Sequence, residues 1–157
     1  MAVIKTQGTG VYVFDGTEVT KLSCITSLDL GTDSVGRIET TCLEETSTKS
    51  YVSGLADPAE ASIEFNLDTV NASHLKLLQY AQDQKDGLQF YIGASDGTAD
   101  ITVSGTPLAA TVPPARSWWQ FKGGVSAPSP KFDADALVGY TVSLQRASKV
   151  TFTPKTP

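Results

Sequence analysis

Apolar and polar residues alternate with a period of two along much of the chain. Residues 62–68, SIEFNLD, place three apolar residues on one side and four polar residues on the other. Residues 35–43, VGRIETTCL, follow the same pattern, with polar positions at Arg37, Glu39 and Thr41. Because successive side chains of a strand point to opposite faces, the pattern predicts two strands that each expose a polar face.

Similar patterns predict further strands and therefore a mostly-β protein. The additional strands are expected at 10–14, 18–24, 88–92, 117–125, 137–145 and 149–153. A polar connection, 126–136, joins the second long pair. Residues 94–116 are rich in Gly, Thr and Pro, and Pro113 and Pro114 cannot donate ladder hydrogen bonds, so we expect loops or a weak edge strand there.

One segment has helical periodicity. Residues 71–86 place Leu75, Leu78 and Ala81 on one side, with Leu77 beside them. An Asn that can cap the N-terminus begins the segment, and a Gly directly follows it. We therefore expect one helix of about four turns laid against a sheet, within a single domain that spans residues 1–157.

About sixteen polar residues, rich in Ser and Thr, join the predicted strands 35–43 and 62–68. Closing a loop of this length costs about 2 to 3 kcal/mol of chain entropy, which a folded protein tolerates. Fixing it costs on the order of 1 to 2 kcal/mol per residue, and only Tyr51, Val52 and Leu55 offer apolar anchors. We therefore expect another subunit to supply the missing contacts.

Composition narrows the function classes. The net charge of −5 and the pI of about 4.7 disfavour a protein that grips nucleic acid through its phosphates. The sequence has neither a basic and apolar leader nor a run of about 18 apolar residues, so we expect synthesis in the cytoplasm and no membrane partner. In a reducing cytoplasm, Cys24 and Cys42 are expected to be buried thiols, although a disulfide stays possible.

Candidate chemistry is sparse, and we expect no catalytic, cofactor-binding or metal-binding residues. His74 is the sole histidine, and no serine or cysteine near it has the sequence context of a nucleophile. The loop carboxylates lack the spacing of a calcium loop; they are Asp96, Asp100, Asp133 and Asp135. If Glu39 and Glu64 lie on neighbouring strands, their two carboxylates form the kind of pair that glycosidases use, so a glycosidase stays an alternative.

The adjacent pair Trp118 and Trp119 has two interpretations. Neighbouring residues of a strand face opposite ways, so one ring is expected in the core and the other on a partner surface. Alternatively, the two rings and Tyr51 would serve a carbohydrate-binding β-sandwich.

Three stretches together resemble the tail tube proteins, or major tail proteins, of long non-contractile-tailed bacteriophages. They are RIETTCLEETSTKSYVSGLADPAEASIEFNLD, GLQFYIG and the closing WWQFKGGVSAPSP with DALVGYTVSLQRAS. The resemblance implies a β-sandwich or barrel-like subunit with one flanking α-helix and a long β-hairpin loop. It further implies hexameric rings that stack into a hollow tube for passage of viral DNA. A tube subunit of a contractile injection or type VI-like secretion system is the alternative.

The resemblance also assigns roles to residues. The lumen-facing candidates are Arg37, Glu39, Thr41, Ser62, Glu64, Asn66, Asp68, Thr141, Ser143 and Gln145. The ring-stacking loop would span about 44–59, with Glu45, Thr46, Thr48, Lys49, Tyr51, Val52 and Leu55 as its contact residues. The chain is too short to add the C-terminal immunoglobulin-like domain of some relatives.

The resemblance implies the following partners and location. The partners would be further copies of the chain, a tape measure protein, a tail terminator, distal tail proteins and viral DNA bound without sequence specificity. The chain would reside in the virion tail after assembly in the host cytoplasm.

Overall fold

The computed structural model describes residues 3–156. This part of the chain contains twelve strands and one helix, joined by loops and turns. The strands are β1 (Gly10–Phe14), β2 (Val19–Leu22), β3 (Ile25–Asp29), β4 (Ser34–Glu39), β5 (Tyr51–Asp57), β6 (Glu60–Asn66), β7 (Leu88–Gly93), β8 (Thr102–Ser104), β9 (Ala109–Thr111), β10 (Trp118–Lys131), β11 (Gly139–Arg146) and β12 (Thr151–Thr153). The helix α1 (Ala72–Gln82) lies between β6 and β7. The prediction of a mostly-β chain with one helix is confirmed.

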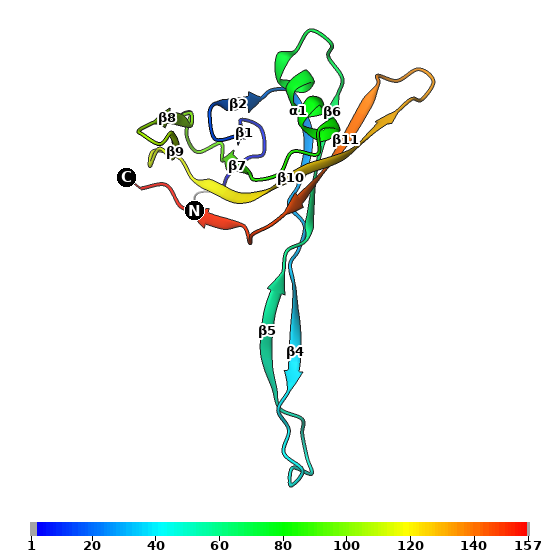
Figure 1. The fold of residues 1–157 in the computed structure, drawn as a ribbon, viewed down its shortest axis with the longest axis vertical. Helices are drawn as coiled ribbons and strands as arrows, with labels where there is room; N and C mark the ends of the chain where they lie inside the picture. The colour runs from blue at the N-terminus through cyan, green and yellow to red at the C-terminus, as the bar shows by residue number, and fades with distance from the viewer. Residues whose placement is uncertain (1–2, 157) are drawn as a thin grey trace.

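Eight strands form one antiparallel sheet in the order β2-β1-β7-β10-β11-β6-β3, with β12 paired to the start of β10. The long strand β10 links two halves of this sheet, because it pairs with β7 over 118–123 and with β11 over 123–131. The end strands β2 and β3 do not pair with each other within residues 3–156, so no barrel closes there. Figure 1 shows β10 and β11 extending together past α1.

One face of the sheet packs against α1 and forms the main core. Its fully buried side chains include Ile63, Phe65, Leu77, Leu88 and Leu144. Burying a side chain of this size stabilises the fold by about 1.5 to 3 kcal/mol. The core therefore holds the sheet and helix together.

Of the residues predicted on the buried side of the helix, Leu77, Leu78 and Ala81 pack against the core, but Leu75 does not, because the buried face is rotated. Leu77 is fully buried beside Tyr80 and Ala81, whereas Leu75 is 48% exposed. The helix also ends at Gln82, short of residue 86. His74 explains the rotated face: its Nδ1 accepts from the Asp68 amide at 3.3 Å and its Nε2 donates to the Ser23 carbonyl at 2.7 Å. With both nitrogens satisfied, this polar ring is completely buried.

A second apolar cluster lies on the opposite face of the sheet. Tyr12, Tyr91 and Trp118 belong to it, and the small β8–β9 hairpin packs against them. Residues 94–116, expected as loops or a weak edge strand, thus contain a hairpin that covers this cluster. Trp118 is fully buried, while Trp119 is half-buried on the other face, 5.1 Å from the ring of Phe152. The prediction that one ring enters the core is confirmed.

The strands β4 and β5 form a separate two-stranded sheet that projects from the main sheet as a long arm (Figure 1). The sequence pattern suggested that the strand at 35–43 neighbours the strand at 62–68, which is wrong. The partner of β4 is β5, and β6 instead pairs with β11 and β3. The polar connection thus contains a strand of its own, and β4 ends at Glu39 because the chain turns there toward the tip.

Both cysteines are free, and both are exposed. Cys24 occupies the turn between β2 and β3 with a positive φ of 56°, and Cys42 lies in the tip of the arm. The prediction of buried thiols is therefore wrong. Each cysteine sits at a turn, where its side chain meets no core to enter.

Candidate assembly surfaces

A polar surface of the sheet lies on β3, β6, β10 and β11, opposite α1. We call it the polar face. Strand register places Glu64 between Ser27 and Thr141, and Ser62 between Asp29 and Ser143. Its members are Ser27, Asp29, Glu60, Ser62, Glu64, Asn66, Ser126, Ser129, Lys131, Thr141, Ser143 and Gln145. All are at least partly exposed, and their ionisable members are three carboxylates and Lys131, which forms an ion pair with Asp133 at 3.6 Å.

The polar face ends at two strand edges that have no partner within residues 3–156. The strand β3 pairs only with β6, which leaves its outer edge open. On the other side, β7 leaves β10 at Gly123, and the Val125 amide makes one more bond, to the Lys85 carbonyl. Open edges present unpaired amides and carbonyls, so each can accept a strand from another chain.

The arm has two unlike faces. Ile38 pairs with Val52 across the two strands on one face, and these two side chains are 56% and 51% exposed. We call Ile38 and Val52 the arm stripe. Val35 lies three residues from Ile38, on the other face with Arg37. Exposed apolar side chains that meet across two strands are typical of a surface that another subunit covers.

The opposite face of the arm is polar and internally bonded. The Arg37 guanidinium stacks on the Tyr51 ring at 4.1 Å, and Lys49 forms an ion pair with Glu39 at 3.6 Å. In the tip, the amide and hydroxyl of Ser47 donate to Glu45, and these bonds lower the pKa of that carboxyl. These contacts hold the Arg37 face of the arm in place, while the arm stripe has no such polar ties.

A buried arginine fixes the base of the arm. Arg146, on β11, is 7% exposed; it forms an ion pair with Asp33 and donates to the Ala59 carbonyl at 3.0 Å. Asp33 precedes β4 and Ala59 follows β5, so one guanidinium holds both chains of the arm. Gly31 lies beside this contact with φ of +72°, and a Cβ there would stand 2.4 Å from the Glu60 carbonyl oxygen.

The structure divides the predicted lumen-facing residues into two groups. Ser62, Glu64, Asn66, Thr141, Ser143 and Gln145 lie together on the polar face. Arg37, Glu39 and Thr41 lie on the arm, away from that face. Asp68 lies beyond β6, where its carboxylate accepts from the Val70 amide. The predicted stacking residues Glu45, Thr46, Thr48 and Lys49 lie in the tip of the arm, and Tyr51, Val52 and Leu55 lie on β5.

Sequence reasoning missed the contribution of β3 to the polar face. A β-bulge between Ile25 and Ser27 shifts the register, so Ile25 and Leu28 both contact the core although they are three residues apart. The strict alternation begins only after the bulge, at Ser27, Leu28 and Asp29. The turn at residues 23–24, which separates β2 from β3, was included in a predicted strand.

No group of three metal-binding side chains occurs among residues 3–156. In that same range no helix is long and apolar enough to cross a membrane. Glu39 and Glu64 belong to separate sheets, and the neighbours of Glu64 across the strands are Ser27 and Thr141. The surfaces described above are therefore the best candidates for function.

Residues 2–156 match the sequence model of a protein family that is described as phage tail tube, TTP, lambda-like. The chain belongs to the lambda-like phage tail tube family. The tail tube family is one of structural proteins, and this chain is a tube subunit and part of the virion tail. A relative, structural protein 3 of Pseudomonas phage PAJU2, is 35% identical over 98% of this chain and 95% of its own length.

Solved structures share the tail tube fold at low sequence identity. A chain of the six-fold symmetrised anti-feeding prophage baseplate has a TM-score of 0.66 and 8% identity, over 100% of both chains. A chain of the SPP1 tail tube has a TM-score of 0.63 and 10% identity, over 99% of this chain and 81% of its own. These similarities concern the fold, which recurs in the SPP1 tail tube and in the anti-feeding prophage baseplate.

Proposed function

We propose that six copies of this tail tube protein close into a ring, and that rings stack into a hollow tube through which viral DNA passes. One observation carries the proposal: a continuous polar face, with three carboxylates and a single lysine that is itself ion-paired, is bounded by two open strand edges. Joining the β3 edge of one copy to the β10 edge of the next would extend the sheet around a closed ring. The six-fold symmetry of the baseplate that shares this fold supports the copy number.

The polar face would then line the channel. Its carboxylates repel the phosphates of DNA, and its hydroxyl and amide groups carry no charge that would hold them. The charge of its one lysine, Lys131, is paired with Asp133. DNA in such a channel slides instead of binding. Among the predicted lumen residues, those on β6 and β11 fit this role, and Asp29 and Glu60 join them.

The arm would make the contact between rings. It extends beyond the main sheet, and its arm stripe is exposed in the single chain (Figure 1). A neighbouring ring would cover these side chains and contact the tip at 40–50. In this proposal Arg37, Glu39 and Thr41 serve the arm instead of the channel wall.

The partners and the place of assembly follow from the role as a tail tube subunit. The tube would enclose a tape measure protein, end at a tail terminator and attach to distal tail proteins. Assembly would take place in the host cytoplasm, in a phage with a long non-contractile tail. A chain of an extracellular contractile injection system shares this fold, which supports a second candidate, a tube subunit surrounded by a contractile sheath.

Electron microscopy of the purified protein over a range of concentrations tests the proposal. We expect six-fold rings and stacked tubes with a central channel. A protein that stays monomeric at every concentration, including with its tail terminator and tape measure protein present, would overturn the proposal. Particles from infected cells with a sheath around the tube would favour the contractile alternative.

A further inference from the structure

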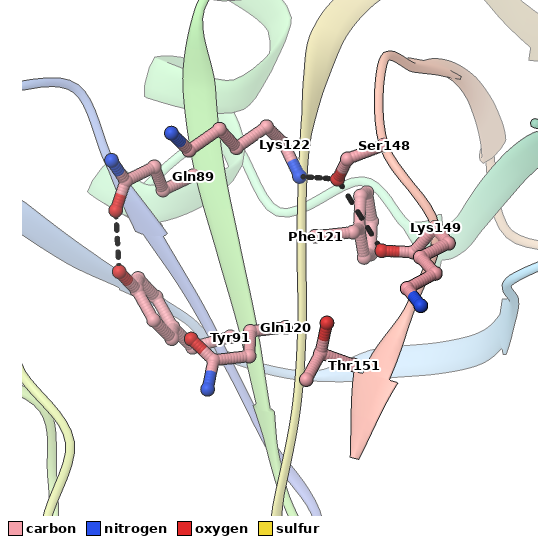
Figure 2. Close-up of a pocket in the computed structure, with 8 residues that line it drawn as sticks. All are labelled: Gln89, Tyr91, Gln120, Phe121, Lys122, Ser148, Lys149 and Thr151. Carbon is pink, nitrogen blue, oxygen red and sulfur yellow. Dashed lines mark hydrogen bonds between the residues drawn. The ribbon is translucent and has the colours of Figure 1, made fainter. Parts of the chain in front are cut away.

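A hollow of about 460 Å³ lies on the same side of the sheet as the polar face, between β7, β10 and the 148–151 segment. Its lining includes Lys122, Lys149, Gln89 and Gln120, and contains no carboxylate. Figure 2 shows the two lysine side chains on opposite sides of the hollow. The hollow is therefore a cationic spot on a chain with a net charge of −5.

Neither lysine has an acidic partner among the residues that the structure describes. The ion pairs among residues 3–156 are Lys21–Asp100, Lys49–Glu39, Lys76–Glu18, Lys131–Asp133 and Arg146–Asp33. Several other polar groups of the hollow already have partners: Tyr91 donates to Gln89 at 2.5 Å, and the Lys122 amide donates to Ser148 at 2.9 Å (Figure 2). Gln120 donates to Thr153 at 3.3 Å. The two amines remain for a partner.

We propose that this hollow receives the acidic turn at residues 29–33 of the neighbouring copy, and that the resulting ion pairs set the register of the ring. The inference rests on the ring of the proposed function and names the side-chain contact that closes it. The occupant is a second copy of this chain, and the recognised group is its Asp29 carboxylate, because Asp33 is already paired with Arg146.

Strand direction brings the two sites together. Three antiparallel pairings separate β10 from β3, so these strands run in opposite directions. Rotational symmetry gives each copy the same orientation along the ring axis, so a neighbour's β3 is antiparallel to the open edge of β10. Its Asp29 end then lies at the Gly123 end of that edge, which is next to Lys122.

The acidic turn is built for such a contact. Asp29 is exposed, and within residues 3–156 its carboxylate accepts one hydrogen bond, from the Gly31 amide at 2.9 Å. Arg146 and the Gly31 turn hold the segment in one conformation. When a rigid acidic turn meets two unpaired lysines, the opposite charges speed the encounter of the two copies and disfavour misaligned contacts. Their contribution to the affinity between the copies is smaller.

Charge reversal tests the contact. We expect Lys122→Glu/Lys149→Glu to form rings about ten-fold or more slowly at low ionic strength, because like charges then face each other. The defect should shrink near 1 M salt, where the Debye length falls to about 3 Å. Adding Asp29→Lys to the double variant should restore assembly, whereas Asp29→Lys alone should assemble poorly. Light scattering and electron microscopy measure ring formation.

Two matched variants keep the result unambiguous. Lys21→Glu/Lys76→Glu makes the same change in net charge on β2 and α1, and should assemble like the wild type. If charge reversal in the hollow prevents folding, as judged by circular dichroism, Lys122→Met/Lys149→Met keeps the side-chain length and should still slow assembly. Normal assembly of a folded hollow variant, or a defect that Asp29→Lys leaves unrescued, would overturn the inference. Failure of the wild type to form rings would instead overturn the proposed function.

Discussion

At the scale of single residues, Arg146 has the largest structural consequence for the arm. Its side chain is 1% exposed, and it joins Asp33, Ala59 and Ser148, which come from three segments of the chain. The hydrogen bond that Arg146 donates lowers the pKa of the Asp33 carboxyl, and a second hydrogen bond, from the Ala59 amide, lowers it further. The direction of the arm thus depends on one buried guanidinium.

We predict that Arg146→Met destabilises the protein by about 2 kcal/mol, because the Ala59 carbonyl loses its donor. For a chain of this size that loss lowers the Tm by about 4 to 8 °C, measurable by calorimetry. Asp33→Asn keeps an acceptor for Arg146 and should cost less. An unchanged Tm in Arg146→Met would show that the contact does not stabilise the base of the arm.

The same pair predicts a pH dependence. The pKa of Asp33 is lower in the folded than in the unfolded chain, so its charge stabilises the fold above the unfolded value of about 3.9. The difference in free energy of unfolding between wild type and Asp33→Asn should therefore vanish as the pH falls through the native pKa. Denaturant unfolding at a series of pH values measures it, and a constant difference would contradict the assignment.

At the scale of elements, the arm is the part of the molecule that the chain's own core does not stabilise. Its strands pair with each other and with no other strand among residues 3–156, and the arm stripe stays exposed. Changes on the arm stripe should consequently affect assembly far more than folding.

We predict that Ile38→Thr/Val52→Thr leaves stability within about 0.5 kcal/mol, since both residues are exposed and threonine keeps the branched shape that strands favour. Rings should form but no longer stack, because the apolar contact between rings is lost. Glu39→Gln/Ser53→Ala, on the opposite face, is the control. Tubes of normal length from the Thr variant, seen by electron microscopy, would rule out the arm stripe as the stacking surface.

At the scale of the whole molecule, the two hairpins project in different directions from the sheet. The arm leaves the β3 and β6 end, and the β10–β11 hairpin extends past α1 (Figure 1). Unlike ends suit head-to-tail stacking, in which one copy's arm meets a different surface of the next. The charge of the polar face is the second property at this scale, because six copies would combine their carboxylates around one channel.

We predict that Glu60→Lys/Glu64→Lys still forms tubes but binds short duplex DNA, because the channel wall becomes cationic. Binding should weaken steeply with added salt, measured by fluorescence anisotropy. Glu18→Lys/Asp83→Lys makes the same change in net charge on the β1–β2 turn and after α1, and it should bind DNA far less. Equal binding by both variants would contradict the assignment of the polar face to the channel.

Alternation along the sequence determined most strands of the main sheet, though not β3, and which of their side chains share a face. The residues at 62–68 and 137–145 specified polar and apolar sides without reference to any other strand, because a side chain's face follows from its position in an extended backbone. The helix and the division between Trp118 and Trp119 followed from the same local rules. The resemblance of the assembled pattern to tail tube proteins was also in the sequence.

Only the tertiary structure decided which strands pair and where they point. Backbone hydrogen bonds are alike for every strand, so alternation could not tell that β4 pairs with β5 instead of lying beside β6. The bulge in β3, the buried His74 face of α1 and the Arg146 contact at the arm's base each join residues far apart in the chain. Such contacts depend on the packed arrangement, which is why the arm and the open edges of the sheet emerged only from the fold.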